Sequence, residues 1–123
     1  MKKMTPGTNI KNPDIIASDL KSGDIILVTV QFTDTLEIKT RPAVVLFQEF
    51  DNVIIAGITS NIRMKGIPLS VEEGAIKPSV IKLNSIFTVS EVMIKRKLFS
   101  LQKEKKAQIY HGIISKLAGL NQD

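Results

Sequence analysis

The fold is decided by "IILVTVQF", residues 25–32, together with the two apolar runs that follow it, "AVVLF" (43–47) and "NVIIAGITS" (52–60). β-Branched and aromatic residues favour strands, and polar stretches separate the three runs. We therefore predict three consecutive strands that pair as an antiparallel meander.

Shorter runs of the same kind indicate further strands at 67–71, 80–83, 87–89 and 97–99. Several short strands joined by short turns are typical of a small barrel. Only "QKEKKAQIYHGIISKLAGL" has helical spacing, and Gly119 can end that helix. Its apolar positions are Ala107, Tyr110, Ile113, Ile114 and Leu117. We predict an α+β fold, mainly β: a small antiparallel β-barrel with short helices and a C-terminal helix.

The length of 123 residues fits one domain. We place it at 22–120, after a loose N-terminal extension (1–21) in which Asn12 and Pro13 can start a short helix. No apolar run approaches the roughly 18 residues of a membrane span, and the basic start "MKKMTPGTNIKNP" has no apolar segment behind it. We therefore expect no membrane contact, no secretory signal and a cytoplasmic location.

The side-chain inventory restricts the chemistry. The absence of cysteine excludes disulfides, thiolate metal sites and cysteine nucleophiles, and a single histidine leaves little for a zinc site. We expect no metal and no cofactor. Seventeen Lys and Arg against twelve Asp and Glu give a net charge of +5, which suits a polyanion or an acidic partner.

One cation stands out by its position, in "EIKTRPAVVL" (37–46), where a polar loop becomes an apolar strand. Pro42 fixes its own backbone and favours an extended conformation for Arg41 before it. The guanidinium is a planar fork of donors that matches a phosphate. Arg41 is therefore a candidate phosphate ligand, and the alternative is a surface arginine that ends a loop.

Five fragments occur in the order "GDIILV", "RPAVVL", "GITS", "KPSVIKLNSIFTV" and "KRKLFSL". In this order and at these intervals they resemble the PemK/MazF family of toxins from type II toxin–antitoxin systems, over about residues 22–120. The resemblance implies an SH3-like barrel, a homodimer and a flexible, acidic antitoxin that covers the RNA groove. It also implies a metal-independent, sequence-specific endoribonuclease (mRNA interferase) for single-stranded RNA, in which the RNA 2′-hydroxyl attacks the phosphodiester.

The resemblance also implies roles for individual residues. Arg41 matches the arginine of the family's Arg-Pro motif, and Thr59 occupies the position of its catalytic threonine. Glu37 lies in the first loop, where many relatives carry an acidic residue, and we expect it to act as the proton acceptor. Ser60 adds a second hydroxyl for RNA binding. The residues alone also allow a turn-forming "TS" pair and a solvated loop glutamate.

Two positions depart from the family pattern where it bears on RNA binding. Asn84 stands where many relatives have an acidic residue, and Phe87 where many have arginine. Phe87 can stack a base or belong to the core, and Lys82 can bind RNA or face water. His111, the only histidine, is expected to have a packing or surface role on the C-terminal helix.

Two functions follow from these observations. The first is an RNA-cleaving toxin with Arg41, Thr59 and Glu37 in catalysis. The second is a non-catalytic nucleic-acid-binding or protein-binding module on the same barrel, because one fold supports many functions.

Overall fold

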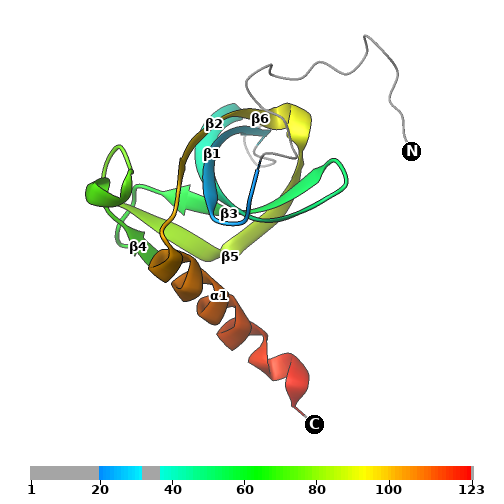
Figure 1. Ribbon diagram of the computed structural model, residues 1–123, viewed down its shortest axis with the longest axis vertical. Coiled ribbons are helices and arrows are strands. Elements are labelled where there is room, and N and C mark those ends of the chain that lie inside the picture. The colour runs from blue at the N-terminus through cyan, green and yellow to red at the C-terminus, as the bar shows by residue number, and fades with distance from the viewer. Residues whose placement is uncertain (1–19, 32–36, 123) are drawn as a thin grey trace.

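The computed structural model describes residues 20–31 and 37–122. Six strands form one antiparallel sheet in the order β4-β5-β3-β2-β1-β6, which curls on itself, and α1 projects from it (Figure 1). The elements are β1 (Asp24–Gln31), β2 (Ile38–Glu49), β3 (Asn52–Thr59), β4 (Ile67–Leu69), β5 (Ser79–Ser90), β6 (Ile94–Ser100), α1 (Lys103–Leu117) and the 3₁₀ turns η2 (Val71–Glu73), η3 (Glu91–Met93) and η4 (Ala118–Asn121). The predicted fold class is confirmed, and β1, β2 and β3 form the predicted meander.

The middle of the sheet is buried on both faces, which explains why β1, β2 and β3 contain continuous apolar runs. Neighbouring residues such as Ile25 and Ile26 point to opposite faces, yet both are fully buried. The buried cluster inside the curl consists of Leu20, Ile26, Val28, Ala43, Val45, Val53, Ile55, Val89 and Ile94. The cluster on the other face consists of Ile25, Val44, Ala56, Ile58, Leu69, Ile81, Leu83, Leu101 and Ile109.

The structure corrects the prediction of separate strands at 80–83 and 87–89, because β5 is one strand of twelve residues. Opposite Gly57 the register shifts between the pairs Ala56–Ile86 and Ile58–Ile81. The intervening "KLNS", which resembles a turn in sequence, is taken up as an irregularity within the strand. Gly57 permits this, since a Cβ there would lie 3.2 Å from the Ser85 hydroxyl.

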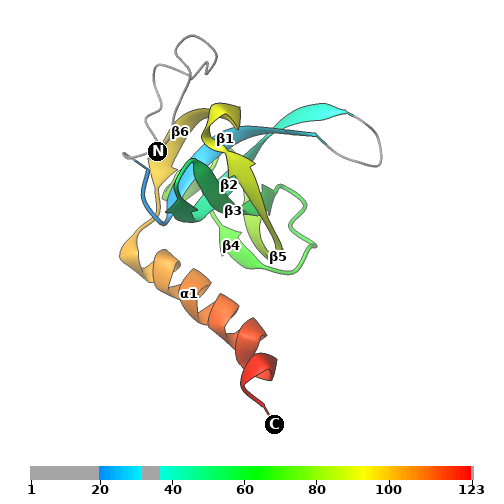
Figure 2. The same ribbon diagram turned by 90° about the vertical axis from the view of Figure 1, so that its right-hand side faces the viewer.

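The C-terminal helix is confirmed, but the face that it buries differs from the predicted one. Ile109 is its one buried residue, whereas Tyr110, Ile114 and Leu117 are exposed. Figure 2 shows that the C-terminal end of α1 extends away from the sheet, so the helix packs against it along a narrow strip that includes Ile109 and Gly112. Gly119 does not end the helix but lies within η4.

Most of the predicted N-terminal helix (13–21) lies outside the described residues, and its described end, Leu20 and Lys21, is not helical. Asp24 closes the "KSGD" turn: its carboxylate accepts hydrogen bonds from the Lys21 backbone N–H and the Ser100 hydroxyl, both at 2.8 Å. The turn is thereby joined to β6. Among the described residues, no helix is long and apolar enough to span a membrane.

Candidate functional site

A cleft of about 650 Å³ opens where several strand ends meet. Its apolar lining consists of Ile25, Leu27, Pro42, Ile58, Leu69, Ala75, Ile76, Leu98 and Phe99. Its polar and charged lining consists of Thr40, Arg41, Thr59, Ser60, Lys77 and Ser79, and Gly74 completes it. Three of the predicted site residues therefore share one cleft: Arg41 from one strand, and Thr59 and Ser60 from the end of another.

Strand pairing explains why Arg41 and Thr59 lie on the same cleft. The ladder between β2 and β3 ends at the pair Ala43–Gly57. Beyond it β2 continues along β1, while β3 continues along β5. Arg41 and Thr59 each lie two residues past the last pair, where the two strands have separated, and both line the cleft. The divergence of the two strands opens the cleft between them.

Arg41 has most of its donors available for a ligand. The residue is exposed, and Nη1 donates one hydrogen bond, of 3.2 Å, to the Thr40 carbonyl oxygen. Among the described residues it forms no ion pair. The Thr40 hydroxyl lies 3.4 Å from the Thr29 hydroxyl of β1, which steadies the strand next to Arg41. The remaining guanidinium N–H groups can therefore bind an anion.

Thr59 combines a turn-forming role with a free donor. Its Oγ1 accepts a hydrogen bond of 3.1 Å from the backbone N–H of Asn61. This is the turn-forming arrangement that the "TS" pair suggested. A hydroxyl that accepts one bond still carries its own proton, so the Thr59 O–H can donate to a ligand in the cleft.

The charge in the cleft has one sign. Among the residues that the structure describes, Arg41 and Lys77 are the two charged ones that line the cleft, and none of the lining residues has a carboxylate or an imidazole. Sequence reasoning missed Lys77. It precedes Pro78 as Arg41 precedes Pro42, so the same argument about an extended residue before proline applied to it.

The other predicted site residues do not join Arg41 and Thr59. Glu37 precedes β2 and pairs with Lys39 at 3.4 Å. Four residues of extended chain, about 13 Å, separate it from Arg41. Lys82 and Phe87 line neither this cleft nor the one described next, and Phe87 is 38% exposed on β5.

Asn84 lines a second cleft, of about 350 Å³, between β5 and α1. The lining residues are Lys65, Gly66, Ile67, Leu83, Asn84, Gly112, Ser115 and Lys116. Gly112 allows the close approach of the helix, since a Cβ there would lie 2.5 Å from Leu83 Cδ1. His111 is exposed on α1 with its ring 5.3 Å from that of Tyr110, edge to face.

The fold and the cleft together define a small curled β-sheet protein with a cationic, hydroxyl-lined cleft. In the part of the chain that the structure describes, no group of three His, Cys, Asp or Glu side chains could hold a metal ion. The chain belongs to the family of PemK-like, MazF-like toxins of type II toxin–antitoxin systems, whose family model matches residues 21–117.

Solved structures share this fold. The Mycobacterium tuberculosis toxin MazF-mt6 is 21% identical, with a TM-score of 0.59 over 80% of this chain and 98% of the toxin. MazE-MazF from Deinococcus radiodurans is 15% identical, with a TM-score of 0.66 over 80% of this chain and 96% of the matched chain. No curated protein matches the sequence.

Proposed function

We propose that this chain acts as a sequence-specific endoribonuclease on single-stranded RNA. Its membership of the toxin family supports a role in growth control by a toxin–antitoxin pair. The observation that carries the proposal is the presence of Arg41 and Thr59 on one cleft, each with donors available for a phosphate. A cleft with cations and hydroxyls suits a polyanionic chain.

RNA supplies its own nucleophile, so the protein needs no covalent residue. The 2′-oxygen bonds to the adjacent phosphorus, and the bond from phosphorus to the 5′-oxygen breaks. The 2′-hydroxyl proton passes to an acceptor, and the 5′-oxygen takes up a proton as it leaves. The products are a 2′,3′-cyclic phosphate and a 5′-hydroxyl. Arg41 would stabilise the charge that develops on the phosphate, and the Thr59 hydroxyl would hold a phosphate oxygen in place.

Glu37 is the proposed proton acceptor. It lies just before β2 and precedes Arg41 by four residues, about 13 Å along an extended chain. Their separation requires that Glu37 acts through water or through movement of this end of β2. Replacement of Glu37 by glutamine should therefore lower the cleavage rate and leave RNA affinity almost unchanged.

We further propose that the protein acts in the cytoplasm as a homodimer. An acidic antitoxin would occupy the RNA cleft, because both ligands need its cations. The similar structure from Deinococcus radiodurans contains MazE together with MazF, which supports such a partner here. Competition is the consequence: a bound antitoxin should exclude RNA, and salt should weaken both complexes.

A second function, RNA binding without cleavage, is favoured by one observation. Among the described residues that line the cleft there is no carboxylate or imidazole, so these residues offer a bound phosphate no ordinary proton acceptor at neutral pH. In that case Arg41, Lys77 and the hydroxyls would hold RNA in place.

One experiment separates the two functions. The purified protein is incubated with a mixed pool of single-stranded RNA in the presence of EDTA, new 5′ ends are mapped, and binding is measured in parallel. Arg41→Ala should abolish cleavage, whereas Arg96→Ala, which removes the same charge outside both clefts, should not. RNA binding without new ends would favour the binding module. If the protein neither binds nor cleaves the RNA, both proposed functions are refuted.

A further inference from the structure

One wall of the cleft is the irregular segment 74–78, which connects η2 to β5. We propose that Lys105 of α1 is a positioning residue of the cleft: its ammonium group holds η2, and with it this wall, in the arrangement that binds RNA, without contacting RNA itself. The proposal rests on the proposed RNA-binding function.

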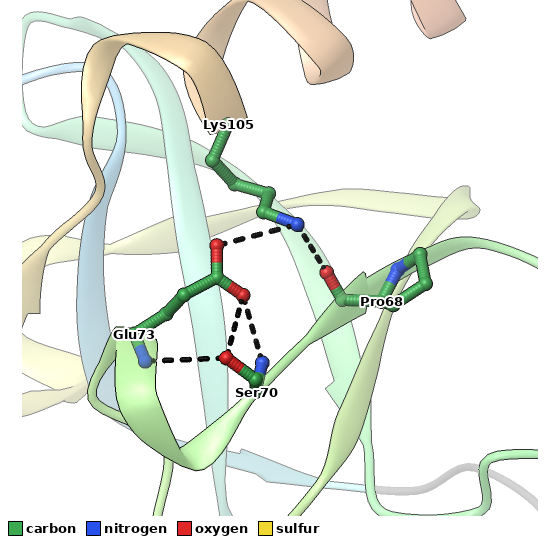
Figure 3. Close-up of polar contacts among 4 residues, drawn as sticks. All are labelled: Pro68, Ser70, Glu73 and Lys105. Atoms are coloured by element: carbon green, nitrogen blue, oxygen red, sulfur yellow. Dashed lines mark hydrogen bonds and ion pairs between the residues drawn. The ribbon is translucent and has the colours of Figure 1, made fainter.

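The turn η2 is closed by a capping box between Ser70 and Glu73 (Figure 3). The Ser70 backbone N–H donates to Glu73 Oε1 at 2.8 Å, and the Ser70 hydroxyl donates to the same oxygen at 3.1 Å. In return, the Glu73 backbone N–H donates to the Ser70 hydroxyl at 3.3 Å. These bonds satisfy donors at the start of the turn and use one oxygen of the Glu73 carboxylate.

Lys105 completes this network from a distant part of the chain. Its Nζ lies 3.3 Å from Glu73 Oε2 and donates a hydrogen bond of 2.6 Å to the Pro68 carbonyl oxygen. Figure 3 shows the ammonium group between the two acceptors. One side chain of α1 is thereby joined to both β4 and the end of η2.

The surroundings of Lys105 distinguish it from other lysines of the helix. Its side chain is 12% exposed, whereas Lys103 and Lys106 are exposed residues. Burial alone would raise the pKa of Glu73, but the hydrogen bonds from Ser70 and the interaction with Lys105 outweigh it and lower the pKa. Glu73 therefore remains a carboxylate and keeps its attraction to Lys105.

The position of η2 is passed on directly to the cleft wall. The backbone N–H of Gly74 donates to the Val71 carbonyl at 2.9 Å, and that of Ala75 donates to the Ser70 carbonyl at 3.3 Å. Gly74, at φ +123°, lies against the ring of Phe99, where a Cβ would be 2.7 Å from a ring carbon. A shift of η2 would therefore displace the wall from Phe99, which itself lines the cleft.

The wall carries groups that can contact RNA. Ile76 is 93% exposed, and Lys77 supplies the second cation of the cleft. Lys105 does not line the cleft, and its ammonium group already has two acceptors. Its effect on RNA would therefore pass through the wall.

The test uses Lys105→Met, which keeps most of the apolar stem and removes the ammonium group, and Lys103→Met as the charge-matched control on the same helix. The first readout needs no RNA: amide hydrogen exchange at Gly74 and Ala75 in the free protein. The second readout is the affinity for a short single-stranded RNA. We expect Lys105→Met to speed exchange at both amides about tenfold or more, since it removes a charge-assisted contact. It should weaken RNA binding several-fold more than Lys103→Met does.

Two further variants check that the pair acts as a unit. Glu73→Gln keeps a side chain suited to the capping box and loses the charge, so it should resemble Lys105→Met. In the double variant, amide exchange and RNA affinity should change little more than in either single variant. Lys105→Arg, which retains a cation, should recover part of the RNA affinity.

Each contrary result overturns a specific step. Unchanged exchange in Lys105→Met would mean that Lys105 does not hold the wall. Unchanged exchange with weaker RNA binding would indicate direct contact of Lys105 with RNA. Faster exchange with unchanged affinity would remove the wall from the RNA site. A parent protein that does not bind RNA would refute the proposed function, and the exchange data would still decide whether Lys105 holds the wall.

Discussion

Thr59 forms a hydrogen bond in a turn and is proposed to donate another to the phosphate. Replacement of Thr59 by valine separates these two roles, because their losses differ in free energy. The hydroxyl accepts one hydrogen bond, from the Asn61 N–H at 3.1 Å, at an exposed position. Loss of such a bond costs about 0.5–1.5 kcal/mol in the free energy of unfolding, and the strand propensity of valine offsets part of it. Loss of a donor aimed at a phosphate in the transition state costs about 100- to 1,000-fold in rate, or roughly 3–4 kcal/mol. A domain with about 5 kcal/mol or more of stability stays folded after the smaller loss.

The assay is single-turnover cleavage of a short RNA, with urea unfolding measured on the same preparations. Thr59→Val should unfold at a slightly lower urea concentration and cleave at least about a hundredfold more slowly. Thr59→Ser, which keeps the hydroxyl, should stay within about tenfold of the parent. A folded Thr59→Val variant that cleaves at the parent's rate would limit the hydroxyl to the turn. Equal losses in both variants would point to the methyl group instead.

Three further predictions address the surroundings of the cleft. Gly112→Ala should destabilise the protein by about 1–2 kcal/mol in urea, because the clash with Leu83 exceeds the gain in helix propensity, whereas Gly119→Ala, with no atom within 4 Å of its Cβ, should be near neutral. Burial raises the pKa of Glu73, but its hydrogen bonds and its ion pair with Lys105 have the larger effect, so the net pKa is lowered. The carboxylate therefore stabilises the fold fully at a pH above the ordinary pKa of glutamate, and this contribution is lost as the pH falls through the lowered pKa. Urea unfolding should therefore show a larger loss in the parent than in Glu73→Gln between about pH 5 and pH 3, and equal losses would contradict this. Asn84→Asp should change the preferred cleavage sequence more than the RNA affinity, because an amide donates and accepts hydrogen bonds whereas a carboxylate only accepts them. An unchanged pattern of RNA ends would mean that Asn84 does not contribute to sequence preference.

The fold was largely predictable because its main signal is local. Residues 25–32, 43–47 and 52–60 are rich in β-branched residues, and each falls mainly within a strand of the meander. The continuity of β5 was not predictable, because Asn84 and Ser85 favour turns and only the pairing of β5 with β3 on either side of Gly57 keeps them within one strand. The buried face of α1 was also missed, since it depends on which part of the helix the sheet covers.

The candidate site was predictable where one short motif carried the information. Arg41 was identified from its position before a proline at a strand entrance, and Lys77 could have been identified in the same way. The interaction of Glu73 with Lys105 could not have been identified from the sequence, because the two residues are 32 positions apart. "SVEE" does contain a capping-box pattern, but nothing local indicates that a helix lysine reaches the second carboxylate oxygen.

The composition of the cleft has a physical consequence for the proposed reaction. A carboxylate beside Arg41 would attract the guanidinium and repel a phosphate, and both effects would weaken RNA binding. A cleft lined by Arg41, Lys77 and hydroxyl groups avoids this, so its donors remain available for the substrate. With this lining, the proton of the 2′-hydroxyl would have to be removed by a group outside the lining, such as Glu37, or by water. Affinity and proton transfer would then depend on different residues, and a substitution that removes cleavage need not remove RNA binding.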